Sequence, residues 1–304
     1  MEALKKWLVG LDLTDHDESI LKYTRLLSDI LNPDHIEFVH IAHRFHDAEQ
    51  VHLPPDLKYT AKDELLDKLN DKVNKYFPDD DGKSCVILEG PVHFDLWHET
   101  WEKEIDLFIA GRKPRHKGRG LFPRKFVRKS FCSVLFVPME VPDGIYNIWI
   151  PSDFSGNSGE ALELAIFLSK SMGQQAVINI HHIYHMPHAY YYEGFPKRQI
   201  LMAVRSAAEE KYQDFMRLHH TDNIKTKVHY TELSQPFMAS DIHEQALQNG
   251  ADLILMASGG RSRLSNFFLG SETEQMAQME TSIPLLILKK KHDRVKLWDL
   301  LSPN

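Results

Sequence analysis

A glycine-rich segment that ends in a serine is the part of this sequence best suited to bind an anion. It runs from Ala257 through Gly260 to Gly270 and Ser271, between an apolar stretch and a segment with helical spacing. Glycines let backbone N–H groups approach a phosphate closely, and the N-terminal end of a helix carries partial positive charge. The segment predicts a phosphate-binding loop. The alternative is an ordinary loop between a strand and a helix, since loops with two glycines and a serine cap are also common where no ligand binds. It is not a Walker loop, because Gly-Lys-Ser/Thr is missing.

Histidines at intervals of three follow two other apolar stretches. The first set is His40, His43 and His46, and the second is His182, His185 and His188. Imidazole is the commonest transition-metal ligand in proteins, and three such side chains can surround zinc where the chain turns tightly. If a metal binds, the second set is the first candidate. The alternative is that both sets are surface residues at the edge of a sheet.

Residue patterns typical of catalysis are missing from the sequence. It contains no G-x-S-x-G elbow, no H-E-x-x-H motif and no pair of carboxylates at a defined helical spacing. We therefore do not expect an enzyme, beyond slow ATP hydrolysis, which needs little more than a bound nucleotide and Mg²⁺.

Short apolar stretches alternate with longer amphipathic segments, which is the pattern of an α/β protein with a parallel sheet covered by helices. The expected strands of the first half are 7–11, 36–41, 84–88, 105–110 and 134–137. Those of the second half are 147–150, 175–183, 226–230, 253–256 and 285–288. The expected helices are 15–31, 57–76, 158–172, 197–219, 238–249 and 271–280.

The same order of elements occurs twice along the chain. After each first strand comes an acid and, two residues later, a hydroxyl: Asp12 and Thr14 correspond to Asp153 and Ser155. The histidine sets and the fourth and fifth strands correspond as well. We predict a tandem duplication with one domain at 1–140, a second at 145–290, a linker around 138–144 and a tail at 291–304.

The stretch from Gly260 to Ser271 closely resembles the G-x2-G-x9-G-S/T signature of universal stress proteins. Stretches 151–155 and 251–256 also resemble the first and fourth strands of that family. The chain is thus similar to a tandem universal stress protein, UspA-like, with two repeats. The resemblance implies two five-stranded parallel-sheet, Rossmann-like domains of the adenine nucleotide alpha hydrolase-like kind. It also implies ATP, with or without Mg²⁺, at the carboxyl edge of the second sheet.

Transferred position by position, the resemblance implies a set of nucleotide contacts. Pro151, Ser152 and Asp153 would contact the adenine and ribose end, and Ile183 would line the adenine pocket. The phosphates would be surrounded by Met256, Ala257, Gly260, Gly270, Ser271 and Glu272.

Several positions depart from that signature. Ala257 replaces its first glycine, and the carboxylate of Glu272 repels a triphosphate unless a metal ion lies between them. The first half departs further, since Pro114 takes the second-glycine position and Arg124-Lys125 replace Gly-Ser. Proline removes an N–H donor, so we do not expect the first half to bind nucleotide in the family's manner.

The charge of the chain is unevenly distributed. The formal net charge of −7 argues against a general nucleic-acid binder. Between Gly111 and Met139, however, there are nine Lys/Arg residues and no acidic ones. This basic loop, residues 112–129, is either a solvated segment or a dock for an anion or a protein partner. The second reading gives the alternative function, an interaction scaffold that docks through 112–129 and binds no nucleotide.

The remaining sequence features concern the protein's surroundings. Two cysteines, Cys85 and Cys132, suit a reducing compartment, and no apolar run reaches the roughly 18 residues of a membrane span. We expect a cytoplasmic protein without a membrane partner, and the resemblance implies a regulatory or sensing role in stress response. It also implies that the two fifth strands pair as an internal pseudo-dimer, which leaves both monomer and homodimer open.

Overall fold

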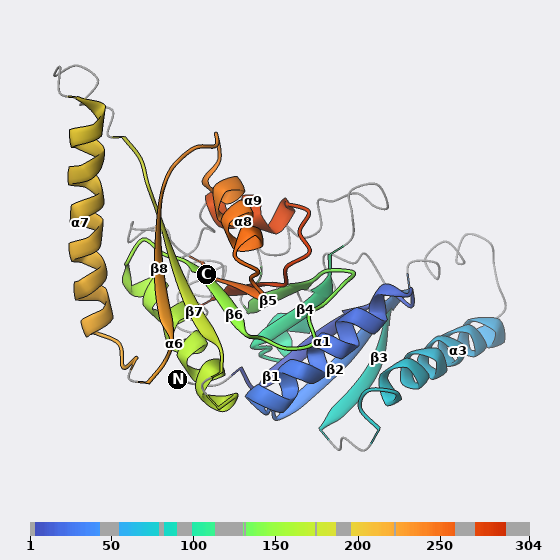
Figure 1. Cartoon of the computed structure of the whole chain (residues 1–304). Helices are drawn as coiled ribbons and strands as arrows, with labels where there is room; N and C mark the ends of the chain where they lie inside the picture. The colour runs from blue at the N-terminus through green and yellow to red at the C-terminus, as the bar shows by residue number, and fades with distance from the viewer. Residues whose placement is uncertain are drawn as a thin grey trace, which may run out of the picture. The chain divides into compact units, whose positions relative to one another are not determined.

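The computed structural model describes residues 4–42, 55–78, 82–89, 99–112, 130, 132–173, 175–186, 196–221, 223–258 and 271–289 (Figure 1). These residues form two compact units, within each of which most of the residue contacts are made. The first unit consists of the described residues of 4–143 together with 277–289, and the second consists of those of 144–276.

The first unit is a mostly parallel sheet with helices. Its elements are β1 (Lys6–Leu11), α1 (His16–Leu31), β2 (His35–Ala42), α3 (Pro55–Asn74), β3 (Lys83–Glu89), β4 (Leu107–Gly111), β5 (Ser133–Val137) and β10 (Leu285–Leu288). The strands lie in the order β3-β2-β1-β4-β5-β10. All pairs are parallel except the last, in which Leu285 lies opposite Phe136 in an antiparallel ladder.

Continuous apolar strands form the core of the first unit. Trp7, Leu8 and Val9 of β1 are fully buried, as expected for a central strand of a parallel sheet with both faces covered. Helix α1 turns Ile20 and Leu27 toward the sheet and packs against β4 and β5. Helix α3 packs against β2 and β3, beside which it is drawn in Figure 1.

The second unit repeats this architecture. Its elements are β6 (Asn147–Pro151), α6 (Gly156–Ser171), β7 (Val177–Tyr184), α7 (Lys197–Arg217), β8 (Thr226–Glu232), α8 (Met238–Gln248) and β9 (Leu253–Ala257). The short helix α9 (Ser271–Gln278) begins within it. The strand order is β9-β6-β7-β8, with β6 parallel to both of its neighbours.

The predicted α/β class with a mostly parallel sheet is confirmed, but the strand count of each unit differs from the five expected. Strand β10, which the repeat pattern assigned to the second half, lies in the first unit because it pairs with β5. The first unit therefore has six strands and the second has four.

An aspartate at the amino edge of each sheet fixes the start of the first strand. Oδ2 of Asp106 accepts hydrogen bonds from the backbone N–H groups of Lys5 and Lys6, at 2.9 and 3.0 Å. Oδ2 of Asp252 accepts from those of Tyr146 and Asn147, at 2.8 and 2.9 Å. These corresponding aspartates therefore have the same structural role in the two units. Within the described part of the chain, none of the helices is long and apolar enough to cross a membrane.

Candidate functional site

The turn after β6 places the carboxylate of Asp153 at the carboxyl edge of the second unit's sheet. Its Oδ1 atom accepts hydrogen bonds from the backbone N–H of Ser155 at 3.0 Å and from the hydroxyl of Ser158 at 2.8 Å. Ser155 is the N-cap of α6, where its hydroxyl lies 3.5 Å from the N–H of Ser158. The carboxylate is therefore held in one orientation next to the positive end of a helix.

Phe154 gives this turn an unusual backbone. Its φ angle is +58°, in the left-handed region that bulky side chains rarely adopt. Its N–H donates to the hydroxyl of Ser152 at 3.0 Å, and its ring packs with Tyr212 and Phe215 of α7. Contacts on both its backbone and its ring thus hold Phe154 in this conformation.

His182 contacts the same turn from β7. Its Nδ1 lies 2.8 Å from the carbonyl oxygen of Ser152, and its ring stacks on that of Phe154 with centroids 4.6 Å apart. Because a carbonyl oxygen only accepts hydrogen bonds, Nδ1 carries the proton and donates. This histidine, predicted as a metal ligand, has a structural partner in the turn.

The strand order brings most of the predicted nucleotide contacts to one edge. Strand β6 lies between β7 and β9, with Pro151 opposite His181 and Trp149 opposite Ile254. The carboxyl ends of the three strands therefore lie side by side, and they carry the predicted contact residues Pro151, Ser152, Asp153, Ile183, Met256 and Ala257. The chain reverses its direction of sheet growth between β6 and β9, which is where open α/β sheets bind their ligands.

The rest of the predicted site lies at or beyond the limit of the described residues. Gly260 and Gly270 are outside them, as is the side chain of Ser271, which begins α9. Glu272 lies in the first turn of α9 and is half-buried. The phosphate-binding role of these residues stays a prediction.

The predicted metal set stays a prediction as well. His182 and His185 are described, and His185 is exposed, whereas His43, His46 and His188 lie outside the described residues. Within the residues that the structure covers, no three His, Cys, Asp or Glu side chains are grouped to hold a metal ion.

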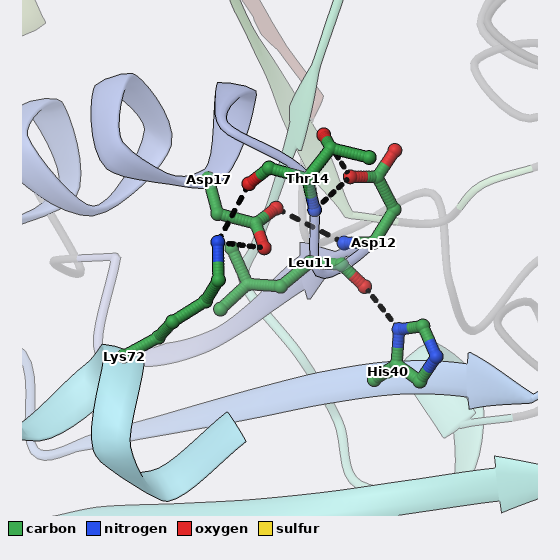
Figure 2. A network of polar contacts seen from close by, with 6 residues as sticks. All are labelled: Leu11, Asp12, Thr14, Asp17, His40 and Lys72. Carbon is green, nitrogen blue, oxygen red and sulfur yellow. Dashed lines mark hydrogen bonds and ion pairs between the residues drawn. The ribbon is translucent and has the colours of Figure 1, made fainter. Parts of the chain in front are cut away.

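The turn after β1 in the first unit has a closely related backbone (Figure 2). Leu13 has a φ angle of +62°, and Oδ1 of Asp12 accepts from the N–H and the hydroxyl of Thr14, at 3.1 and 2.5 Å. Nδ1 of His40 lies 3.0 Å from the carbonyl oxygen of Leu11, as His182 does to Ser152. The correspondence predicted from the sequence thus extends to the hydrogen bonds.

An ion pair between a buried aspartate and a half-buried lysine distinguishes this turn from its counterpart. Asp17 is fully buried and takes the place of Ser158, and its Oδ1 accepts from the N–H of Asp12 at 3.0 Å. Lys72 of α3 reaches in with its Nζ 3.3 Å from Oδ2 of Asp17 and 2.6 Å from the carbonyl oxygen of Thr14 (Figure 2). Burial raises the pKa of Asp17, against the opposing effects of the Asp12 amide and the Lys72 ammonium group.

His16 fills the space in front of β4 in the first unit. It is buried at the start of α1, and its Nε2 lies 3.1 Å from the carbonyl oxygen of Val137. A β-carbon on Gly111 would lie 2.7 Å from Cε1 of His16. The corresponding residue of the second unit, Asn157, is a smaller and half-buried side chain. The first unit therefore has an imidazole near the ends of β1 and β4, where the direction of sheet growth reverses in that unit.

Arg112 is the one member of the basic loop 112–129 that the structure describes. It is buried, and its guanidinium group lies 5.2 Å from the centre of the Phe136 ring. Its backbone N–H donates to the carbonyl oxygen of Val137 at 2.7 Å. Burial lowers the pKa of Arg112 to about 10, so it stays charged at neutral pH. Arg112 is thus part of the packed unit, and the docking role of residues 113–129 stays a prediction.

A second histidine of β7, His181, points to the face of the sheet opposite His182. It is buried, with its Nε2 2.8 Å from the hydroxyl of Thr231 and its ring 5.1 Å from that of Trp149. Burial lowers the pKa of His181 to about 3, and repulsion from His229 adds to this. His181 is therefore neutral at physiological pH.

Some residues that form these turns have only a weak signal in the sequence. Ser158 could have been found as a second hydroxyl five residues after Asp153. The roles of Lys72 and Phe154 could not, because Lys72 comes from a helix 58 residues away from Thr14 and the φ angle of Phe154 depends on its surroundings.

Comparisons with known proteins assign a family to this arrangement. A model of the universal stress protein family matches residues 145–289. A universal stress protein from Archaeoglobus fulgidus is similar in structure, with a TM-score of 0.61, 16% sequence identity, and coverage of 96% of this chain and 98% of its own. A functionally unknown protein from Pseudomonas aeruginosa has a TM-score of 0.67 at 16% identity, with coverage of 98% and 97%.

These structural likenesses extend over both halves of the chain and concern the fold. A search of curated proteins finds no match. The family match covers β6 to β10 and includes the turn with Asp153 and the segment between β9 and α9. Residues 145–289, which make up nearly half of the chain, therefore form a domain that matches the universal stress protein family.

Proposed function

We propose that this chain is a tandem universal stress protein whose second half binds ATP, with or without Mg²⁺, for a regulatory or sensing role in the cytoplasmic stress response. The observation that carries the proposal is the turn after β6. There the carboxylate of Asp153 is fixed by Ser155 and Ser158, at the edge where the sheet reverses between β6 and β9.

The chemistry of this edge suits a nucleoside. A fixed carboxylate accepts hydrogen bonds from ribose hydroxyls or from the amino group of adenine. Ile183 and Met256, at the ends of β7 and β9, are apolar neighbours suited to a flat base. The sequence between Ala257 and Ser271 would then supply backbone N–H groups to the phosphates at the start of α9.

Two measurements on the full chain test the proposal. Mass spectrometry of the ligand released from denatured, freshly purified protein should find adenine nucleotide, and calorimetric titration with Mg-ATP should give heat of binding. Asp153→Asn and Gly270→Val should each weaken ATP binding, because they remove a charged acceptor and insert a side chain between loop and phosphate. Asp12→Asn, the matching change in the first half, should leave ATP binding unchanged.

If no nucleotide copurifies and titration with Mg-ATP gives no heat of binding, this function is wrong. The remaining candidate would then be the interaction scaffold that docks through residues 112–129. Equal ATP affinity in the wild type, Asp153→Asn and Gly270→Val would instead show that the nucleotide binds elsewhere on the chain.

A further inference from the structure

The turn that presents Asp153 needs support from outside its own sequence. A phenylalanine with a φ angle of +58° is held in a conformation that its side chain disfavours. Such residues persist only where the surrounding structure determines their conformation, and they concentrate at ligand sites. Phe154 therefore needs contacts from other elements of the second unit to keep this conformation.

His182 contacts the turn on both sides of Asp153. Before the aspartate, its Nδ1 donates to the carbonyl oxygen of Ser152 at 2.8 Å. After it, the imidazole stacks on Phe154, with centroids 4.6 Å and planes 21° apart. One side chain of the neighbouring strand thus contacts both residues that flank Asp153.

The first unit repeats the hydrogen bond of this arrangement but not the ring contact. His40 lies 3.0 Å from the carbonyl oxygen of Leu11, and Leu13 takes the left-handed position there with a φ angle of +62°. In that turn Lys72 and Asp17 supply additional contacts. The histidine-to-carbonyl bond therefore accompanies the left-handed turn in both units, and the aromatic stack is specific to the second.

We propose that His182 is a positioning residue for the nucleotide site, holding the Ser152–Phe154 turn so that the Asp153 carboxylate is oriented before a ligand arrives. This inference rests on the proposed function, and it deepens it by naming the group that preorganises the site. His182 acts through Asp153 and need not touch the ligand itself. Preorganisation raises affinity because less ordering is needed on binding.

Two substitutions separate the hydrogen bond from the stack. In His182→Asn the amide nitrogen takes the approximate place of Nδ1, so the donor is kept and the ring is lost. In His182→Phe the ring is kept and the donor is lost. His40→Asn and His40→Phe are matched controls in the first unit.

Two readouts are needed on the full chain. The first is the dissociation constant for Mg-ATP, measured by titration calorimetry. The second is the hydrogen exchange rate of the Ser155 amide in ligand-free protein, because this N–H donates to Asp153. The unfolding midpoint of each variant is measured alongside, so that a general loss of stability is recognised.

The expected result is graded by variant. His182→Phe should raise the dissociation constant about tenfold and speed exchange of the Ser155 amide by a similar factor. His182→Asn should keep most of the affinity and protection, and both His40 variants should leave ATP affinity as in the wild type. If the wild type binds ATP and His182→Phe binds equally well with unchanged exchange, the positioning role is wrong.

Failure of the proposed function has a different signature. If the wild type does not bind ATP, that function fails, yet the exchange rate of the Ser155 amide in His182→Phe still tests whether His182 holds the turn.

A further result would overturn the positioning role of His182. If His182→Phe and His40→Phe lose ATP affinity equally, the loss reflects a general effect on the fold.

Discussion

The turns after β1 and β6 have nearly the same backbone but are stabilised by different chemistry. Each has a left-handed residue after the aspartate and a histidine bound to the preceding carbonyl group. The first turn is held by the ion pair of buried Asp17 with half-buried Lys72, and the second by the hydroxyl of Ser158 and an aromatic stack. The backbone geometry is therefore separable from the charges around it.

Removing the ammonium group should have the largest effect on this comparison. Lys72→Met leaves the buried carboxylate of Asp17 without its partner, so the first unit should lose about 3 kcal/mol of unfolding free energy. Hydrogen exchange of peptides from α1 and β1 measures this loss. Lys68→Met, an exposed position on the same helix, is the control and should change the unfolding free energy by less than about 0.5 kcal/mol.

A double variant sharpens that test. Adding Asp17→Asn to Lys72→Met removes the uncompensated charge and should recover part of the lost stability. No recovery would mean that Lys72 acts through its bond to Thr14 rather than through the ion pair.

Glycine substitutions in the two units should have opposite signs. Gly111→Ala places a β-carbon 2.7 Å from Cε1 of His16, so it should destabilise the first unit by roughly 2 kcal/mol. At Gly156, where a β-carbon would meet nothing within 4 Å, Gly156→Ala should stabilise α6 by about 0.5 kcal/mol. Chemical denaturation measures both changes. Equal behaviour of the two variants would contradict the tight packing assigned to His16.

Acidification should affect the second unit more than the first. The pKa of His181 falls from 6.5 to about 3 on folding, so between these values the unfolded chain takes up a proton that the folded chain does not. Stability should therefore be full above pH 6.5 and decline as the pH falls, by up to about 2 kcal/mol at pH 5. Denaturation at several pH values tests this, with His181→Asn expected to flatten the profile. The first unit has Val39 at the matching place and lacks this source of acid sensitivity.

A smaller loss of stability than for Lys72→Met is expected when the hydroxyl of Ser158, which takes the place of Asp17, is removed. Ser158→Ala removes the hydroxyl that donates to Oδ1 of Asp153 and accepts from its backbone N–H, and should cost about 1 kcal/mol of stability in the second unit. Thermal unfolding followed by exchange of α6 peptides measures it. A cost as large as that of Lys72→Met would show that the two turns are equally dependent on their polar partners.

The sequence was sufficient for those features that follow from local patterns. The alternation of apolar and amphipathic segments indicated the α/β class. The correspondence between Asp12 and Asp153 in the two halves of the sequence located both turns. The role of His182 was not predictable, because spacing along a strand does not say which carbonyl group an imidazole meets. The same holds for Lys72, whose partners lie on another element. The pairing of β5 with β10, by contrast, agrees with the expectation that the two fifth strands pair.

The pairing of β5 with β10 has a consequence for how the chain is made. Ser133 and Lys289 are joined by a hydrogen bond across 156 residues, so β5 must wait for its partner while the second half leaves the ribosome. All five residues of β5 are buried in the finished fold. During that interval this apolar strand has one unpaired edge, which is the kind of surface that other nascent chains add to and that chaperones cover. The first unit, most of which is translated first, is therefore complete only after β10 has been synthesised.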